Sequence, residues 1–257
     1  MRSSLVGSEM CIRDRAINCQ DVIFQDIQAI IFDKDGTLED SQEFLRNLGQ
    51  KRARLIDAKI PGIGEPLLMA FGIDANNINP TGLMAIGSRR ENEIAAAAYI
   101  AETGRGWLES LTIAKEVFAE TDQILRKSTP SSMFEGSQEV LKYLSQYGIK
   151  LGILSADNTT AVENFVKYYQ LNDYIELEMG VDDSRSKPDP ELFLQACQKL
   201  GVKPIRALMV GDSPMDMEMG RKAGAAGCIG ICWQKMEANY LQAADVVIAK
   251  LEEIKVF

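Results

Sequence analysis

Short apolar runs alternate along the chain with longer segments in which apolar residues recur every three or four positions. The runs are Ile27–Phe32, Ile149–Leu154, Ile175–Met179, Ala207–Val210, Cys228–Cys232 and Val246–Ile248. Runs that are apolar on both faces are typical of buried parallel strands. Because helical patterns such as Ser137–Tyr147 and Glu191–Leu200 lie between them, we expect an α/β fold built on a parallel sheet.

Residues 41–129 interrupt this alternation. We find no convincing strand there, and the pattern predicts helices at Glu43–Lys59, Glu65–Phe71, Arg90–Glu102 and Leu108–Leu125. A stretch of roughly 90 residues is far longer than an ordinary connection between two elements. The insertion leaves the carboxyl end of the first strand, where open α/β sheets bind ligands. We therefore expect a lid over the mouth of the sheet, with an additional structural layer as the alternative.

The first 15 residues have a different character from the rest. The segment Ser4–Arg15 resembles a translated adaptor sequence from DNA library preparation, so we interpret residues 1–15 as a non-native segment and exclude them from the fold. The remaining chain divides into an α/β core of residues 16–40 and 130–257 and a helical cap of residues 41–129.

The net charge of −9 argues against a nucleic-acid partner and against an anionic membrane surface, because both recruit clustered lysine and arginine. No apolar run is long enough to cross a bilayer, and Met1–Arg15 lacks the apolar core of a secretory signal. The five cysteines form no CxxC pair, which favours reduced thiols. We therefore expect a cytoplasmic protein; the sequence makes no prediction of its oligomeric state.

The sequence contains no histidine. A Ser-His-Asp triad and a His-ligated zinc site are thereby excluded. Proton transfer near neutral pH must fall to carboxylates, lysine, tyrosine or cysteine. A metal site would consist of oxygen ligands, which favour Mg²⁺ over zinc or copper.

Two aspartates directly follow the first buried run, in the sequence Asp33-Lys-Asp-Gly-Thr-Leu38. Asp33 and Asp35 lie two residues apart, so in an extended chain they point the same way, and Gly36 permits a sharp turn. A hairpin turn is the alternative, but the sequence becomes helical where a second strand would be needed. Two carboxylates at one strand end repel each other unless a positive group joins them. A divalent cation is the expected group.

A second acidic pair occurs in Gly211-Asp-Ser-Pro-Met-Asp216, after another apolar run. Asp212 ends the strand, and Asp216 falls in the first turn of the helix that Pro214 begins. Alone, Asp216 would be explained by the preference of helix N-termini for acidic residues. Beside a second acidic strand end, metal binding is the better explanation.

Ser155 and Lys187 stand at the ends of two further elements. Ser155 closes the run Ile149–Leu154, where a helix N-cap is the alternative role. Lys187 precedes a helix start restrained by two prolines, and a solvated surface lysine is its alternative.

In order and spacing, these motifs resemble those of the haloacid dehalogenase superfamily of phosphatases. Its DxDGT motif is matched by Asp33, Asp35, Gly36 and Thr37, and its GDxxxD motif by Asp212 and Asp216. Its Ser/Thr motif is matched by Ser155, and its lysine motif by Lys187. The similarity extends from about Gln28 to Ile248. The resemblance implies a Rossmann-like three-layer core with an inserted all-α cap, which is similar to the type 1 cap of that family.

The resemblance also implies roles for the matched residues. Asp33 would be the nucleophile that forms an aspartyl-phosphate, and Asp35 the general acid and base. Lys187 would offset the negative charge on Asp33 and the phosphate. Mg²⁺ would be held by Asp33, the main-chain carbonyl of Asp35, and Asp212, with Asp216 near it. The phosphoryl oxygens would be bound by Ser155, Ala156, Thr37 and Lys187.

The cap contains one substrate signal. The stretch Gly87-Ser-Arg-Arg-Glu91 resembles one found in some type 1 caps, so Arg89 or Arg90 would clamp a carboxylate or a second phosphate. Solvated arginines at a helix start are the alternative. The expected substrate is a phosphorylated small molecule with a second anionic group, as for a phosphoglycolate phosphatase-like enzyme. A hexose-phosphate mutase and a non-catalytic regulatory protein of the same superfamily remain the alternatives.

Overall fold

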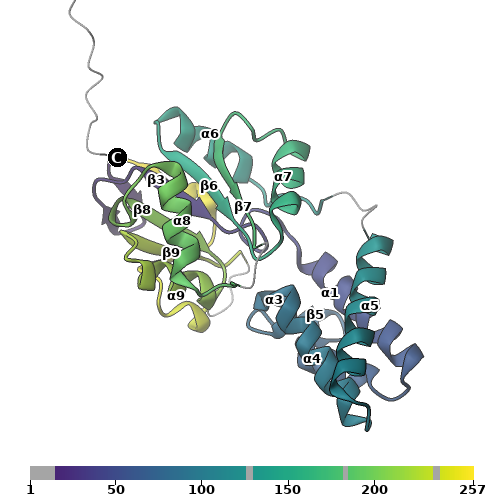
Figure 1. Ribbon diagram of the computed structural model, residues 1–257. Coiled ribbons are helices and arrows are strands. Elements are labelled where there is room, and N and C mark those ends of the chain that lie inside the picture. Colours follow the sequence, from purple (N-terminus) through teal and green to yellow (C-terminus); the bar gives the residue numbers. More distant parts are fainter. Residues whose placement is uncertain (1–14, 126–129, 182–184, 234–237) are drawn as a thin grey trace, which may run out of the picture.

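The computed structural model describes residues 15–125, 130–181, 185–233 and 238–257. Its centre is a six-stranded parallel sheet in the order β10-β9-β8-β3-β6-β7 (Figure 1). The strands are β3 (Ala29–Phe32), β6 (Lys150–Leu154), β7 (Ile175–Met179), β8 (Ala207–Gly211), β9 (Gly227–Ile231) and β10 (Val246–Ile248). Each corresponds to one of the six apolar runs, so the expectation of a parallel α/β sheet is confirmed.

Helices cover both faces of this sheet. They are α6 (Ser137–Gln146), α7 (Thr159–Tyr168), α8 (Pro190–Leu200) and α9 (Pro214–Ala223). Because side chains alternate along a strand, Ile30 and Phe32 of β3 pack in one buried cluster with α6 and α7. Ala29 and Ile31 pack on the other face with α8 and α9. The result is the expected three-layer arrangement.

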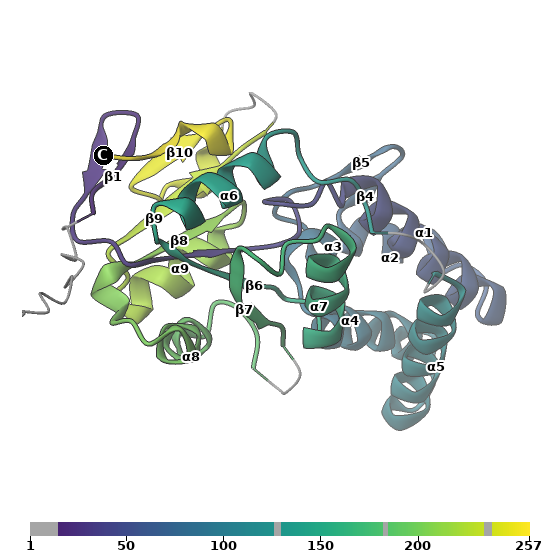
Figure 2. The ribbon, with the colours of Figure 1, turned by 90° about the horizontal axis from the view of Figure 1, so that it is seen from above.

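A helical region is inserted between β3 and α6 and lies to one side of the sheet (Figures 1 and 2). Its helices are α1 (Gln42–Lys59), α2 (Gly64–Phe71), α3 (Leu83–Ile86), α4 (Arg89–Glu102) and α5 (Trp107–Leu125). They enclose a hydrophobic core of their own, which includes the fully buried Phe71 and Phe118. The exact boundaries of a cap domain at residues 41 and 129 stay a prediction.

This region also contains a small hairpin, formed by β4 (Ile73–Asp74) and β5 (Asn77–Ile78). The expectation that residues 41–129 hold no strand was wrong in this detail. Strands of two residues are too short to produce the alternation by which a strand is recognised in a sequence.

A second sheet, in the order β11-β1-β2, lies at the chain ends. It consists of β1 (Ile17–Cys19), β2 (Val22–Phe24) and β11 (Ile254–Val256), and short 3-10 turns occur at Pro204–Arg206, Asn239–Leu241 and Leu251–Glu253. Residues 1–14 of the expected non-native segment lie outside the described residues. Within the described part of the chain, every helix is too short or too polar to cross a lipid bilayer.

Candidate active site

Three of the motif residues meet at one edge of the parallel sheet. β3 lies between β6 and β8 and runs parallel to both, so the carboxyl ends of the three strands lie side by side. Asp33, Ser155 and Asp212 are the residues that directly follow these strands. The backbone N–H of Asp33 donates to the carbonyl of Val210 at 2.8 Å, which ties the first motif to the strand that carries the last.

Lys187 joins two of the acidic residues. Its Nζ lies 2.7 Å from Asp33 Oδ1 and 2.7 Å from Asp216 Oδ1, and all three side chains are buried. The other oxygen of Asp216 accepts hydrogen bonds from the Ser213 hydroxyl at 2.5 Å and the Ser213 backbone N–H at 3.3 Å. Both oxygens of Asp216 are therefore engaged by protein groups, and Asp216 anchors Lys187 behind Asp33.

Asp33, Asp212 and Asp216 form the acidic cluster of the site, with one oxygen of each within 4.8 Å of the others. Burial, assisted by the neighbouring charges of Asp216 and Asp35, raises the pKa of Asp33 to about 7 although Lys187 acts to lower it. Burial also raises the pKa of Asp212 well above its ordinary value, and Asp33 and Asp216 add to this effect. Burial first, and repulsion between the carboxylates second, thus disfavour the ionised forms of Asp33 and Asp212, and a nearby positive charge would favour them.

The chemistry of the cluster fits a divalent cation. Three carboxylates face a single lysine ammonium, so the fully ionised cluster carries an excess of negative charge that one divalent ion would offset. An all-oxygen donor set suits a hard cation such as Mg²⁺ or Ca²⁺. A bound cation would also reverse the pKa shifts of Asp33 and Asp212, because it favours the ionised carboxylates.

The turn after β3 brings its backbone against Asp212. Gly36 has φ +76°, and a β-carbon built on it would collide with the Asp212 carboxylate. The hydroxyl of the fully buried Thr37 donates to Asp212 Oδ1 at 3.4 Å. The structure thus places Thr37 against Asp212, and its expected contact with the phosphate stays a prediction.

Lys34 is a site residue that the motif comparison did not identify. Its Nζ lies 2.8 Å from Asp35, 2.8 Å from Glu39 and 3.0 Å from Asp157. Burial opposes the charged form of Lys34, but the three carboxylates outweigh this effect and raise its pKa well above the ordinary value. The available signal was its position between the two motif aspartates, at the end of a fully buried strand.

Asp35 remains accessible at the surface of this network, with 24% of its side chain exposed. Burial raises its pKa, and the nearby Lys34 ammonium partly opposes that rise. A carboxyl group with a raised pKa can hold a proton nearer to neutral pH, as a general acid must.

The loop after β6 presents Ser155 and Ala156 beside Asp35. The buried Ser155 hydroxyl lies 3.5 Å from Asp35 Oδ2 and accepts the Asp157 backbone N–H at 3.1 Å, while the Ser155 amide donates to Met179. Among the described residues, nothing accepts the backbone N–H of Ala156. This amide is available to a bound anion.

The two arginines expected to bind substrate begin α4. Arg89 Nε lies 2.8 Å from Glu93, and its guanidinium also pairs with Asp122, so its charge is neutralised within the helical region. Arg90 is exposed at the same helix start. Neither residue belongs to the wall of the cavity beside Asp212.

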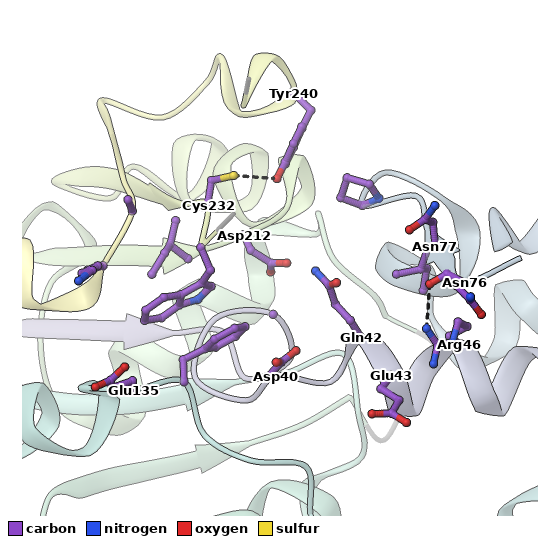
Figure 3. Close-up of a pocket in the computed structure, with 18 of the residues that line it drawn as sticks. Asp40, Gln42, Glu43, Arg46, Asn76, Asn77, Glu135, Asp212, Cys232 and Tyr240 are labelled. Carbon is purple, nitrogen blue, oxygen red and sulfur yellow. Dashed lines mark hydrogen bonds between the residues drawn. The ribbon is translucent and has the colours of Figure 1, made fainter. Parts of the chain in front are cut away.

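That cavity has a volume of about 1030 Å³ and adjoins the acidic cluster through Gly36 and Asp212 (Figure 3). Residues of the helical region, among them Arg46 and Asn77, form the opposite wall. The family motifs did not indicate these residues, because the segments that form the cavity are far apart in the sequence and come together only in the folded protein.

Comparisons with known proteins show which enzymes this chain resembles. The chain is 32% identical over 124 residues to pyrophosphatase PpaX of Bacillus cereus (strain AH820), covering 47% of this chain and 57% of that protein. It is 30% identical over 122 residues to validoxylamine A 7'-phosphate phosphatase of Streptomyces hygroscopicus subsp. limoneus, covering 47% and 56%. The chain therefore spans little more than half the length of these curated relatives.

A solved structure extends the likeness to the whole fold. The crystal structure described as a predicted phosphoglycolate phosphatase from Haemophilus somnus 129PT superposes with a TM-score of 0.67 at 19% identity, covering 88% of this chain and 95% of that one. The family model described as haloacid dehalogenase-like hydrolase matches residues 27–224, a range that includes all three residues of the acidic cluster. The chain therefore belongs to the haloacid dehalogenase-like hydrolases.

Proposed function

We propose that this protein is a Mg²⁺-dependent phosphatase that hydrolyses a small-molecule phosphate monoester through an aspartyl-phosphate on Asp33. The observation that supports it best is the meeting of Asp33, Asp212 and Lys187 at the carboxyl edge of the sheet. Phosphoryl transfer depends mainly on positioning and on neutralising negative charge, and this edge supplies both.

In the first step, a carboxylate oxygen of Asp33 attacks phosphorus and the ester P–O bond breaks. Asp35 donates its proton to the departing alkoxide, which leaves as the alcohol. In the second step, Asp35 takes a proton from water as the water oxygen attacks phosphorus. The bond between Asp33 and phosphorus then breaks, which releases inorganic phosphate and regenerates the Asp33 carboxylate.

Asp33, Asp212 and the main-chain carbonyl of Asp35 would hold the Mg²⁺ ion. Asp216 is assigned the supporting position, because its two oxygens already bind Ser213 and Lys187. When bound, the ion supplies positive charge to the phosphoryl oxygens.

The phosphoryl group would be bound by the Ser155 hydroxyl, the Ala156 amide and Lys187. Lys187 holds Asp33 in place and remains fully ionised at neutral pH, since Asp216 and Asp33 raise its pKa in spite of burial. Its ammonium therefore offsets the charge that gathers when an anionic phosphate approaches an anionic nucleophile.

Phosphate release from p-nitrophenyl phosphate in the presence of Mg²⁺, compared between the parent and Asp33→Asn, tests the proposal. The parent should release phosphate and become acid-stably labelled at Asp33, whereas Asp33→Asn should do neither. A hexose-phosphate mutase would instead require a bisphosphate activator and release little phosphate. A regulatory protein would show neither turnover nor labelling, and either result would reject the proposal.

The names of the relatives leave two substrate classes to be compared. One relative is named as a pyrophosphatase and the other as a phosphatase of validoxylamine A 7'-phosphate. A substrate with a second anionic group, as in phosphoglycolate, would require a cation free to bind it. Rates for pyrophosphate, for phosphoglycolate and for the phosphate ester of an uncharged sugar, measured side by side, distinguish these classes.

A further inference from the structure

The cavity beside Asp212 is the place where the leaving group of the proposed reaction would lie. Asp212 lines this cavity, and one of its oxygens lies within 4.8 Å of an Asp33 oxygen, so a phosphate held at Asp33 would lie beside this space. In Figure 3, Asp212 points into the cavity, and Gln42 faces it from the start of α1. The volume of about 1030 Å³ accommodates a ring-sized group.

The charge of the described cavity wall is negative even when Asp212 is left out. Its other acidic residues are Asp40, Glu43, Glu135 and Glu252, and its basic residues are Arg46 and Lys250. Arg46 is partly engaged, because its Nη1 donates to the carbonyl of Asn76 at 2.8 Å. A second anionic group on the substrate would meet a net repulsive field here.

The uncharged part of the wall suits a hydroxylated ring. Phe134 and Trp233 are stacked with their ring centroids 4.3 Å apart, which gives the cavity a flat apolar side. Gln42, Asn76 and Asn77 add amide side chains. An amide both donates and accepts hydrogen bonds, as does a hydroxyl group, so the two are matched.

Two arginines of the inserted helices, Arg52 and Arg89, do not change this charge balance. Arg52 Nη2 lies 3.3 Å from Asp122, and its guanidinium packs 4.0 Å from the centre of the Phe118 ring. Arg89 pairs with Asp122 and Glu93. Each of these cations is therefore neutralised inside the helical region.

We propose that the leaving group is a hydroxylated ring with no negative charge beyond the phosphate, either neutral or bearing an amine. This inference rests on the proposed phosphatase function and specifies its substrate class. It predicts that pyrophosphate and phosphoglycolate are poor substrates.

Steady-state rates for matched ring phosphates test it: glucose 1-phosphate, glucosamine 1-phosphate and glucuronate 1-phosphate, with p-nitrophenyl phosphate as a general substrate. We expect kcat/KM for the first two to exceed that for glucuronate 1-phosphate, phosphoglycolate and pyrophosphate at least tenfold. An anionic substrate that is equal or better overturns the inference. So does a preparation that hydrolyses p-nitrophenyl phosphate but neither uncharged nor amine-bearing ring phosphates. Loss of p-nitrophenyl phosphate turnover would instead reject the phosphatase function itself.

Charge variants of the wall give a second measurement. In Glu43→Gln combined with Glu135→Gln, the preference for glucose 1-phosphate over glucuronate 1-phosphate should shrink at least threefold. Glu109→Gln combined with Glu116→Gln is the matched control, because both residues are exposed on α5 and pair with Arg105 and Lys59 outside the cavity. An unchanged preference in the double variant, or an equal change in the control, counts against a role for the wall charge.

Discussion

Gly36 lies so close to Asp212 that any side chain at position 36 would occupy the space of the Asp212 carboxylate. The same glycine has φ +76°, a conformation that residues with a β-carbon rarely adopt. The turn after β3 and the acidic end of β8 are thus fitted to each other, and the position of Asp212 depends on the absence of a side chain opposite it.

Gly36→Ala should therefore damage the metal site more than the fold. We expect a loss of about 1–3 kcal/mol in the free energy of unfolding from backbone strain. We also expect a fall in kcat of at least about 100-fold, since misplaced charged groups lose most of their electrostatic contribution. Urea unfolding, phosphate release and a Mg²⁺ titration by calorimetry measure the three effects.

Gly62→Ala is the matched control for this change. Gly62 also has positive φ, +97°, but an added β-carbon would meet nothing within 4 Å. It should show comparable strain with normal turnover and Mg²⁺ affinity. If both variants lose activity equally, the contact with Asp212 is not the cause.

Lys34→Met should be strongly destabilising. The change removes the ammonium that Asp35, Glu39 and Asp157 share, and it leaves the buried Glu39 carboxylate without this counter-charge. Breaking a buried ion pair from one side costs about 3–5 kcal/mol. Unfolding in urea should show a loss of this order, and the added Glu39→Gln change should restore part of it.

An exposed lysine provides the comparison for Lys34. Lys222 pairs with Glu218 at 2.6 Å, but 53% of its side chain is exposed. Lys222→Met should change the free energy of unfolding by less than about 1 kcal/mol. Equal losses at the two positions would show that the Lys34 network adds no stability.

The sheet was predictable because its strands and the helices that cover it each have a pattern of apolar residues that can be recognised in the local sequence. Most of its six strands are short apolar runs, although β7 contains Glu176 and Glu178, and each helix that packs on the sheet has regular apolar spacing. Asp33 and Asp212 could be grouped because each directly follows such a strand, whereas Lys187 was added by the resemblance to the family motifs. Parallel strands then bring those ends to one edge without further information.

Features that depend on tertiary contacts escaped this reasoning. The three carboxylates around Lys34 come from positions 35, 39 and 157, and nothing in the local sequence links the last to the first two. The edge sheet of β1, β2 and β11 joins the two ends of the chain through strands of three residues. Arg89 pairs with Asp122, 33 residues away, a contact that the local sequence does not indicate. The expectation that Arg89 or Arg90 binds the substrate stays a prediction.

The cysteines should differ sharply in reactivity. Burial raises the pKa of the Cys19 and Cys197 thiols to about 12 and that of Cys228 to about 11, so few thiolates form at neutral pH. Cys232 is only partly buried. In a Cys11→Ser background, which removes the cysteine outside the described residues, Ellman's reagent should label one thiol quickly in the folded protein and four after unfolding.

Replacing Cys232 with serine in the same background identifies the reactive thiol. The fast phase should disappear, and the unfolded protein should then yield three thiols. A fast phase that survives Cys232→Ser would place a reactive thiol among the three buried cysteines.

The metal-free protein should lose stability as the pH rises from about 4 towards 7. Asp33 has a pKa of about 7 in the folded protein against an ordinary value of 3.8, so over this interval the unfolded chain releases a proton that the folded chain retains. Proton release from the unfolded state alone favours unfolding. Melting temperatures in EDTA should therefore fall across this range, and Mg²⁺ should reverse the fall at pH 8 because it binds the ionised carboxylates.

Asp33→Asn isolates the contribution of this one group. The variant cannot ionise at position 33, so its melting temperature in EDTA should fall less steeply with pH than that of the parent, and Mg²⁺ should stabilise it less. Asp173→Asn, at an exposed position, should follow the parent in both respects. If Asp33→Asn keeps the pH slope of the parent, then the raised pKa of Asp33 is not the cause of that slope. If Mg²⁺ stabilises Asp33→Asn as much as the parent, then Asp33 is not a ligand of the ion.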